Sequence, residues 1–330
     1  MMIARPTWTP ALRSLLLTGL VLTAFVFGGA PAEAGATRHY YLAAEESFWD
    51  FAPTGRDLVS GGPVPMPWRD HTRWVKVRYI EYTDDTFTRR VPQPSWLGIL
   101  GPRIRAEVGD TIQVHFLNRT DEFQGIHPQG VRVKEAEAAF HAAGRALAAP
   151  GGSLTYTWTV DAESGPAAGD PSSIVRWYGA PVDAGLNAAL LGPILITRAG
   201  MGRPDGGASD VDQEFILVFK VFDEARGYGK GQMHSINGYI FGNLPGLITR
   251  NGERVRWHIL DLGAAAEVKT PPPFAVPAKI GMKGSETIRV SSGRMTVTDM
   301  LADDPGAWAL RGQAPDDVNA GMAAIYTVIP

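Results

Sequence analysis

The chain carries short runs of apolar, β-branched and aromatic residues, and clusters of Gly, Pro and Asp separate these runs. Apolar and polar positions alternate within several runs, as in Thr111-Ile-Gln-Val-His-Phe116. Alternation with a period of two, with turn residues at short intervals, is typical of β-sandwiches. We therefore expect an all-β protein with strands at 38–43, 74–81, 111–117, 153–160, 194–197, 214–219, 254–260, 287–290 and 324–329. The exception is the Ala-rich stretch 133–147, which favours a helical turn or two in an inserted loop.

Two segments of the chain repeat each other. Residues 104–117 (I-R-A-E-V-G-D-T-I-Q-V-H-F-L) match residues 247–260 (L-I-T-R-N-G-E-R-V-R-W-H-I-L) at an offset of 143 (247 minus 104). In both segments a Gly and an acidic residue lead into a strand, and His115 is matched by His258. The repeat predicts two copies of one β domain. We interpret the matched histidines as structural, because neither has a partner at the spacing of metal ligands.

The N-terminal segment is typical of a secretory signal. Arg5 and Arg13 precede an uncharged apolar run at 15–29. Ala32-Glu-Ala34 then supplies small residues at the spacing of a cleavage site. We expect cleavage before Gly35 and an exported protein, in the periplasm, at the cell surface or outside the cell; a retained anchor is the alternative. No later stretch has the roughly 20 apolar residues of a membrane span. The predicted organisation is a signal peptide at 1–34, a first domain at 35–198, a Gly-rich linker at 199–210 and a second domain at 211–330.

Composition excludes several kinds of chemistry. The chain has no cysteine, which excludes disulfides, thiolate catalysis, zinc–thiolate sites and iron–sulfur clusters. Blue copper centres are excluded as well, because they are built on a Cys thiolate. A formal net charge of −3 argues against nucleic acid or an anionic membrane surface as the main partner.

A series of motifs, in chain order, points to one family. They are W-L-G-I-L-G-P at 96–102, M-H-S-I-N-G-Y at 233–239, G-N-L-P-G-L at 242–247 and W-A-L-R-G-Q-A-P-D-D-V-N-A-G-M at 308–322. These motifs resemble the two-domain multicopper oxidases and the A domains of ceruloplasmin and the clotting cofactors. The resemblance extends over nearly the whole chain after the signal segment. It implies two tandem cupredoxin-like (plastocyanin-like) Greek-key β-sandwich domains.

In this family, four His-rich stretches hold the copper ions. One copper accepts electrons and is held by His, Cys, His and a weak Met, while eight His hold three coppers that reduce oxygen to water. By resemblance, this chain keeps only His127 and Met322 among these positions, as vestigial ligands. The other ligand positions carry non-ligating or altered residues, namely Gln129, Gly179, Pro181, Lys269, Pro272, Phe274, Arg311, Gly312, Gln313 and Asp317. Lys269 and Arg311 also place positive charge where a cation would bind.

The two retained residues have structural interpretations as well. His127 is a leftover ligand, half of a site that another chain completes, or an imidazole that forms hydrogen bonds within the former pocket. Met322 is interpreted as a core residue, because its counterpart in the repeat, Leu190, is apolar.

The lost ligands lead first to the hypothesis of a non-catalytic multicopper-oxidase homologue. Such a protein would be a binding or assembly module, as the clotting-cofactor A domains use this frame mainly to bind partners. Two-domain members of the family commonly form trimers. The expected partners are therefore further copies of the chain, in a homotrimer, or a multicopper oxidase paralogue. No cofactor is expected in the chain alone, and copper is expected only where a partner completes the site.

Two other hypotheses stay open. One is a copper-binding oxidoreductase of the multicopper oxidase type, in which His127 joins a site whose other ligands come from a partner chain. The other is a binder in the emptied pocket, either of an anionic small molecule or of a hard metal ion such as calcium near residues 313–319. The residues expected to line that pocket are Gln129, Lys269, Arg311 and Asp317.

Overall fold

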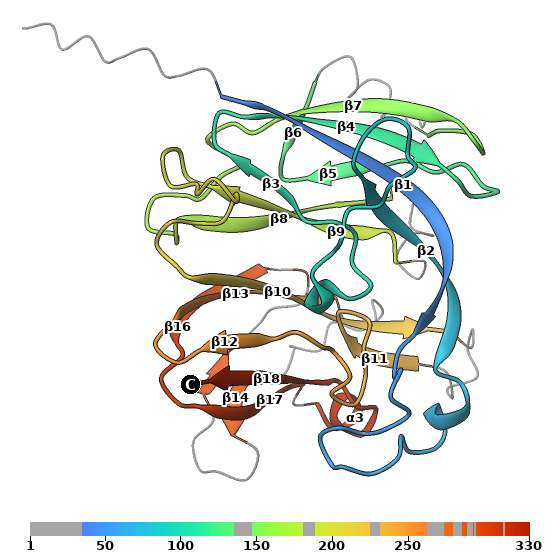
Figure 1. Cartoon of the computed structure of the whole chain (residues 1–330), viewed down its shortest axis with the longest axis vertical. Helices are drawn as coiled ribbons and strands as arrows, with labels where there is room; N and C mark the ends of the chain where they lie inside the picture. Colours follow the sequence, from blue (N-terminus) through green and yellow to red (C-terminus); the bar gives the residue numbers. More distant parts are fainter. Residues whose placement is uncertain are drawn as a thin grey trace, which may run out of the picture. The chain divides into compact units, whose positions relative to one another are not determined.

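The computed structural model describes residues 35–134, 147–180, 189–224, 232–262, 274–279, 286–288, 293, 295–312 and 314–330, with 274–279 and 286–288 as backbone. Residues 34–330 form one compact unit. That unit is built almost entirely of β-strands, as the alternating pattern predicts (Figure 1). The expected signal peptide at 1–34 and most of the Ala-rich stretch 133–147 lie outside the described residues.

The first half of the chain forms two sheets. One has the strand order β2-β1-β4-β7-β6, and the other has the order β3-β9-β8-β5. The strands are β1 (Thr37–Asp50), β2 (Arg73–Tyr82), β3 (Ile104–Glu107), β4 (Thr111–Asn118), β5 (His127–Gln129), β6 (Arg132–Val133), β7 (Ser153–Thr159), β8 (Ser173–Gly179) and β9 (Leu191–Thr197). Two short 3-10 helices lie in the connecting loops, η1 (Trp68–Asp70) and η2 (Ser95–Leu97).

The second half of the chain repeats this arrangement. Its sheets have the orders β11-β10-β13-β16 and β12-β18-β17-β14-β15. The strands are β10 (Gln213–Asp223), β11 (Gln232–Ile236), β12 (Ile248–Arg250), β13 (Arg254–Leu262), β14 (Phe274–Lys279), β15 (Glu286–Ile288), β16 (Met295–Leu301), β17 (Gly306–Arg311) and β18 (Ala323–Ile329). A short helix, α3 (Pro315–Asn319), lies between β17 and β18. The result is a pair of cupredoxin-like sandwiches, and none of the described strands pairs across residues 199–210.

The repeat found in the sequence has a structural basis. Strands β3 and β4 correspond to β12 and β13, and β4 pairs in parallel with β1 as β13 does with β10. At the connecting turns, Gly109 and Gly252 have positive φ angles of 106° and 87°, which glycine adopts without a steric penalty. The carboxylates of Asp110 and Glu253 each accept a hydrogen bond from the backbone N–H three residues earlier, at 2.8 and 2.9 Å. The Gly-acidic pair therefore fixes the same turn twice.

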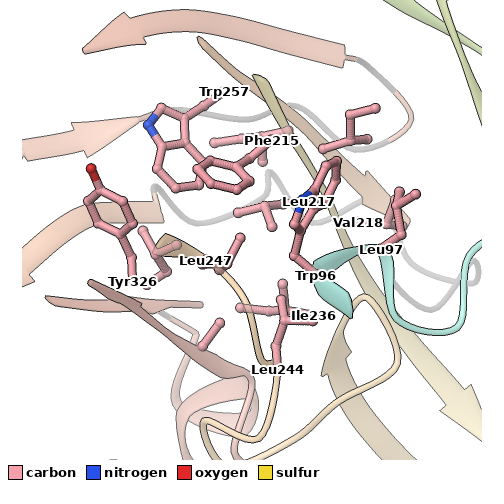
Figure 2. Close-up of a cluster of buried hydrophobic side chains, with 14 of the residues drawn as sticks. Trp96, Leu97, Phe215, Leu217, Val218, Ile236, Leu244, Leu247, Trp257 and Tyr326 are labelled. Carbon is pink, nitrogen blue, oxygen red and sulfur yellow. The ribbon is translucent and has the colours of Figure 1, made fainter. Parts of the chain in front are cut away.

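The largest hydrophobic cluster joins the two sandwiches. Figure 2 shows Trp257, Phe215 and Tyr326 of the second sandwich in one cluster with Trp96 and Leu97 of the first. The Trp257 and Tyr326 ring centroids are 5.0 Å apart, and those of Trp96 and Phe215 are 5.4 Å apart, both edge to face. Edge-to-face aromatic pairs add to the free energy gained by burying their surface. The core thus extends across the boundary between the sandwiches.

A buried polar network also connects the two halves. Arg256 on β13 is 1 % exposed. Its Nη1 donates to the hydroxyls of Ser172 and Ser173, at the start of β8, at 2.8 and 2.9 Å. Its Nε donates to Asp299 at 2.7 Å and its Nη2 to Asp210 at 3.1 Å. Because a buried charge is tolerated only when it is paired, this network holds the segment before β10 against both sandwiches.

The histidines at matched positions each have a side-chain partner. His258 is fully buried, and its Nε2 lies 3.2 Å from Glu214 Oε1. His115 Nε2 lies 3.0 Å from Nδ1 of His39, which is exposed. The strand registers place His39 and Glu214 at equivalent positions, diagonal to the histidine on the neighbouring strand. The side-chain pair at these equivalent positions is therefore buried in the second sandwich and exposed in the first. Spacing along the sequence did not reveal either pair.

Candidate metal centre

The fourth ligand stretch forms a closed loop between β17 and β18. β17 ends at Arg311, and α3 begins at Pro315. Proline suits the first position of a helix, because the N–H there has no partner within the helix. The N–H of Gly312 donates to the carbonyl of Met322 at 3.0 Å, and the N–H of Met322 donates to the carbonyl of Asp317 at 2.9 Å. These bonds bring the two ends of the stretch together.

Gly312, Asp317 and Met322 converge on one point. A Cβ atom added at Gly312 would lie 2.9 Å from the Cβ of Asp317 and 3.2 Å from the Sδ of Met322. A side chain on residue 312 would therefore project between the other two. The resemblance assigns the cysteine ligand to this position, so three positions expected for ligands surround one point, with a glycine where the thiolate is expected.

Asp317 has a partner from another strand. Its Oδ1 lies 2.7 Å from Nδ1 of His234 on β11, and the two side chains are 18 % and 13 % exposed. Met322 is 2 % exposed and belongs to the main hydrophobic cluster, in agreement with its interpretation as a core residue. The carboxylate of Asp317, at a position where the resemblance leads us to expect a histidine ligand, thus contacts the imidazole of His234 in the M-H-S-I-N-G-Y motif.

The first and second ligand stretches meet in the first sandwich. β5 pairs with β8 so that His127 lies opposite Gly179, and Gln129 lies opposite Trp177. His127 is half-buried, and burial lowers the pKa of its imidazole, which favours the neutral form. Gln129 is exposed. Pro181 lies outside the described residues.

The third ligand stretch lies beside the fourth. Phe274 is the first residue of β14, and the next residue, Ala275, lies opposite Arg311 of β17. Lys269, Pro272 and Gln313 lie outside the described residues, as does the side chain of Phe274. The β5·β8 pairing brings the first and second stretches together in the first sandwich. The β14·β17 pairing brings the third and fourth together in the second sandwich.

A cavity of about 320 Å³ opens next to the converging residues. Arg311, Met322 and Asn319 line one side, and Asp57 and Phe241 line another. Gln129 and Asp317, which the sequence placed in one pocket with Arg311, are not part of its lining. Gln129 lies on β5 of the first sandwich, and Asp317 is turned to His234.

The residues at the former copper positions do not fit copper. Copper in such proteins is held by neutral imidazole and thiolate, which combine affinity with a tuned potential. The fourth stretch instead provides a guanidinium at Arg311, no side chain at Gly312 and a hydrogen-bonded carboxylate at Asp317. In the part of the chain that the structure describes, no three residues of the types His, Cys, Asp and Glu gather at a distance suited to a metal ion.

Comparison with known proteins agrees with these motifs. A family model described as multicopper oxidase matches residues 80–200. Hephaestin of Mus musculus is 34 % identical over 343 residues, which cover 89 % of this chain and 29 % of hephaestin. The chain belongs to the multicopper oxidase family. The multicopper oxidase relatives also include the protein named ferroxidase HEPHL1 of Homo sapiens, 28 % identical over 369 residues, or 98 % of this chain and 31 % of that protein. Coagulation factor V of Homo sapiens is 30 % identical over 314 residues, or 92 % of this chain and 14 % of factor V.

The chain spans less than a third of the length of these relatives, with 29 %, 31 % and 14 % of their lengths matched. Solved structures agree with the fold. A crystal structure of a multicopper oxidase has a TM-score of 0.57 at 18 % identity, with 88 % of this chain and 89 % of that chain covered. Copper nitrite reductase from Nitrosomonas europaea has a TM-score of 0.55 at 17 % identity, with 88 % and 94 % covered. Among the described residues, no helix has the length and apolar character to cross a membrane.

Two polar residues of interest were not singled out from the sequence. His234 has no ligand-like spacing to any candidate, and its partner Asp317 lies 83 positions away. Glu81 lies in a segment with the pattern of a half-buried strand, and no sequence rule indicates that its carboxyl has no partner among the described residues. His234 was already inside a motif of the family, which is the one signal that pointed toward it.

Proposed function

We propose that this multicopper oxidase homologue is an exported, non-catalytic binding or assembly module. The observation that carries the proposal is the convergence of Gly312, Asp317 and Met322. A redox copper at that point requires a thiolate and imidazoles, and the residues there supply a glycine and a carboxylate paired with His234. On this proposal the frame of the centre is retained and its ligand chemistry is lost, so we derive no electron-transfer step through it.

The duplicated fold supports self-association. Within the chain, the β10–β13 face that carries Glu214 and His258 is covered by β8, where the hydroxyl of Ser173 donates to Glu214. The equivalent face of the first sandwich carries His39 and His115, and His39 is exposed. A second copy would repeat the intrachain contact if it presented the outer face of its β12–β18–β17 sheet. Contacts between unlike faces form a ring when the rotation between successive copies closes, and the family analogy makes a trimer the expected ring.

The outer face of the β12–β18–β17 sheet carries partly exposed apolar side chains, which such a contact would bury. Ile248 on β12 is 49 % exposed, and Ile325 and Thr327 on β18 are half-buried. In the first sandwich, Val175 and Leu195 belong to the strands that correspond to β17 and β18, and both are buried in the core shared with the second sandwich. The same position in the fold is thus covered in one sandwich and partly open in the other.

The test is the copper content of the chain from Gly35 onward, together with its mass in solution. The protein is loaded with copper, dialysed and analysed by elemental mass spectrometry, and its mass is determined by light scattering. We expect far less than one copper per chain and the mass of a trimer. A tightly held copper that is lost in His127→Ala and kept in the control His71→Ala would contradict the proposal, because His71 is an exposed loop residue.

The same preparation separates the other two hypotheses. A copper-binding subunit would take up copper only with a multicopper oxidase partner, and His127→Ala would abolish that uptake. An anion binder would show a rise in thermal stability with phosphate or a small carboxylate. That rise would be lost in Arg311→Gln, because Arg311 is the described cation that lines the cavity of about 320 Å³.

A further inference from the structure

A second cavity, of about 260 Å³, lies in the first sandwich. Its lining comes from the end of β2, from the loop and 3-10 helix η2 that follow, and from the residues around the start of β3. Its polar lining residues are Glu81, Gln93, Arg103 and Arg105. None of these residues belongs to the former copper positions, and the cavity contributes nothing to the function proposed above.

Glu81 lies on the inner side of β2. It is two residues after Tyr79, which is fully buried, and it pairs across the sheet with Leu42, which is also fully buried. Among the described residues, no group donates a hydrogen bond to the Glu81 carboxyl, and it forms no ion pair there. Burial raises the pKa of this carboxyl to about 7. A carboxyl in such a position is stabilised by any donor that enters the cavity.

The surroundings explain why Glu81 has no partner within the chain. Three of the cavity's wall residues are prolines at positions 92, 94 and 102, which have no backbone N–H to donate. The hydroxyl of Tyr40 donates to the carbonyl of Arg105 at 2.8 Å, and the hydroxyl of Tyr178 donates to the carbonyl of Pro102 at 2.6 Å. The side-chain amide of Gln93 donates to the carbonyl of Leu100 at 3.0 Å. The hydroxyls of Tyr40 and Tyr178 and the amide of Gln93 are therefore committed to backbone carbonyls rather than to Glu81.

Two arginines line the same cavity as Glu81, and among the described residues neither forms an ion pair with it. Arg103 and Arg105 flank the fully buried Ile104, so the alternation of β3 puts both on the same face. The guanidinium of Arg103 lies over the ring of Trp96, 5.4 Å from its centroid. Burial is the cause of the raised pKa of Glu81, and no charge of either arginine offsets it. A carboxyl and two guanidinium groups thus line one cavity without pairing with each other.

We propose that this cavity binds a small zwitterion with one ammonium and one carboxylate group, as in an amino acid. The ammonium group pairs with Glu81, and the carboxylate pairs with Arg103 and Arg105, whose guanidinium groups suit planar carboxylates. A simple cation would have to enter beside two guanidinium groups, and a simple anion would have to enter beside Glu81. At ~30 Å³ per water, about 260 Å³ holds roughly nine waters, which leaves room for a short amino acid together with several waters.

The experiment is isothermal titration calorimetry of the dialysed chain from Gly35 onward at neutral pH. The probes are glycine, β-alanine and 4-aminobutyrate, which differ only in the spacing of the two charges. Propylamine and propionate each carry one of the two charged groups. We expect at least one zwitterion to bind about tenfold or more tightly than either single-charge probe, since each lost charged contact costs about a factor of ten.

Three variants accompany the titrations. Glu81→Gln removes the charge at one end of the cavity, and Arg103→Gln removes a charge at the other end. Both are expected to weaken binding of the zwitterion about tenfold or more, while the exposed control Arg89→Gln leaves it unchanged. Glu81→Gln is expected to remain folded, because it removes an unpaired carboxyl.

Several results would overturn the proposal. Equal binding of propylamine would make the cavity a cation site at Glu81, and equal binding of propionate would make it an anion site at the arginines. Absence of heat with all five probes at high concentration would show that the cavity takes no ligand of this class. Binding of a zwitterion that survives both Glu81→Gln and Arg103→Gln would place its site elsewhere on the protein.

Discussion

Replacement of Glu81 by Gln is expected to stabilise the folded chain at neutral and alkaline pH and to leave its stability nearly unchanged in acid. The pKa of Glu81 is raised from 4.5 to about 7 by burial. A raised acid pKa means that the folded state binds the proton more tightly than the unfolded state. The contribution of Glu81 to stability is therefore highest below pH 4.5, falls as pH rises toward 7, and stays low above it. Gln removes the ionisation while keeping nearly the same size.

The size of the effect follows from the shift in pKa. A rise from 4.5 to about 7 is about 2.5 units, and each unit corresponds to about 1.36 kcal/mol, so the penalty at high pH is roughly 3 kcal/mol. Tyr40 and Tyr178 stay neutral in this range, because burial raises the pKa of each phenol. Arg103 and Arg105 stay charged throughout. The pH dependence of the difference between the two proteins is therefore assigned to Glu81 alone.

The assay is urea unfolding followed by tryptophan fluorescence, in buffers without amines or carboxylates, near pH 4 and near pH 8.5. The difference in unfolding free energy between Glu81→Gln and the parent is expected to be near zero at the lower pH and about 3 kcal/mol at the higher pH. Glu46→Gln, on an exposed position of β1, is the matched control and should show no such change. An equal difference at both pH values, or a less stable variant at the higher pH, would refute the reasoning.

Four further substitutions test other parts of the fold. Arg256→Met leaves two carboxylates without their buried cation, and we expect a loss of about 3–5 kcal/mol in urea unfolding; a loss below about 1 kcal/mol would contradict the network. Gly109→Ala and Gly252→Ala are each expected to cost about 1–2 kcal/mol, because alanine resists a positive φ; clearly unequal costs would argue against equivalent turns. Burial opposes ionisation of Glu214, but hydrogen bonds and charge from His258 outweigh it and lower the pKa of Glu214 to about 2. This contribution is complete above pH 4.5 and is lost as pH falls toward 2, so Glu214→Gln should flatten an acid titration of fluorescence in that window.

The strands were predictable because their signal is local. Alternation at 111–117 predicts β4 to within one residue, and the matched segment at 254–260 predicts β13 to within two. β10 was predicted at 214–219, where every residue is buried, but it runs from Gln213 to Asp223, because the strand continues through four further residues that are mostly half-buried. The resemblance then supplied the order of the strands, which local patterns alone do not contain.

The polar contacts were not predictable from the sequence. The pairing of His234 with Asp317 depends on β11 and α3 meeting across 83 positions, and neither residue has a local signal for it. The unpaired carboxyl of Glu81 depends on three prolines and two tyrosines that come from four different segments. By contrast, the convergence of Gly312 with Met322 falls within eleven positions, and the family motif implied it directly.

The core shared between the sandwiches bears on how the chain is made. Part of this core comes from the first sandwich and is synthesised long before the part from the second sandwich against which it packs. The first part includes Trp96, Trp177 and Leu195, and the second includes Phe215, Trp257 and Tyr326. About 130 residues separate Thr197 from the end of β18, and at 5–20 residues per second their synthesis takes roughly 6–26 s. During that interval the first sandwich carries an apolar face with nothing to cover it. A chain whose synthesis pauses near residue 200 would therefore be an aggregation-prone intermediate. Slow codons between the two halves would prolong its exposure to chaperones and to other nascent copies.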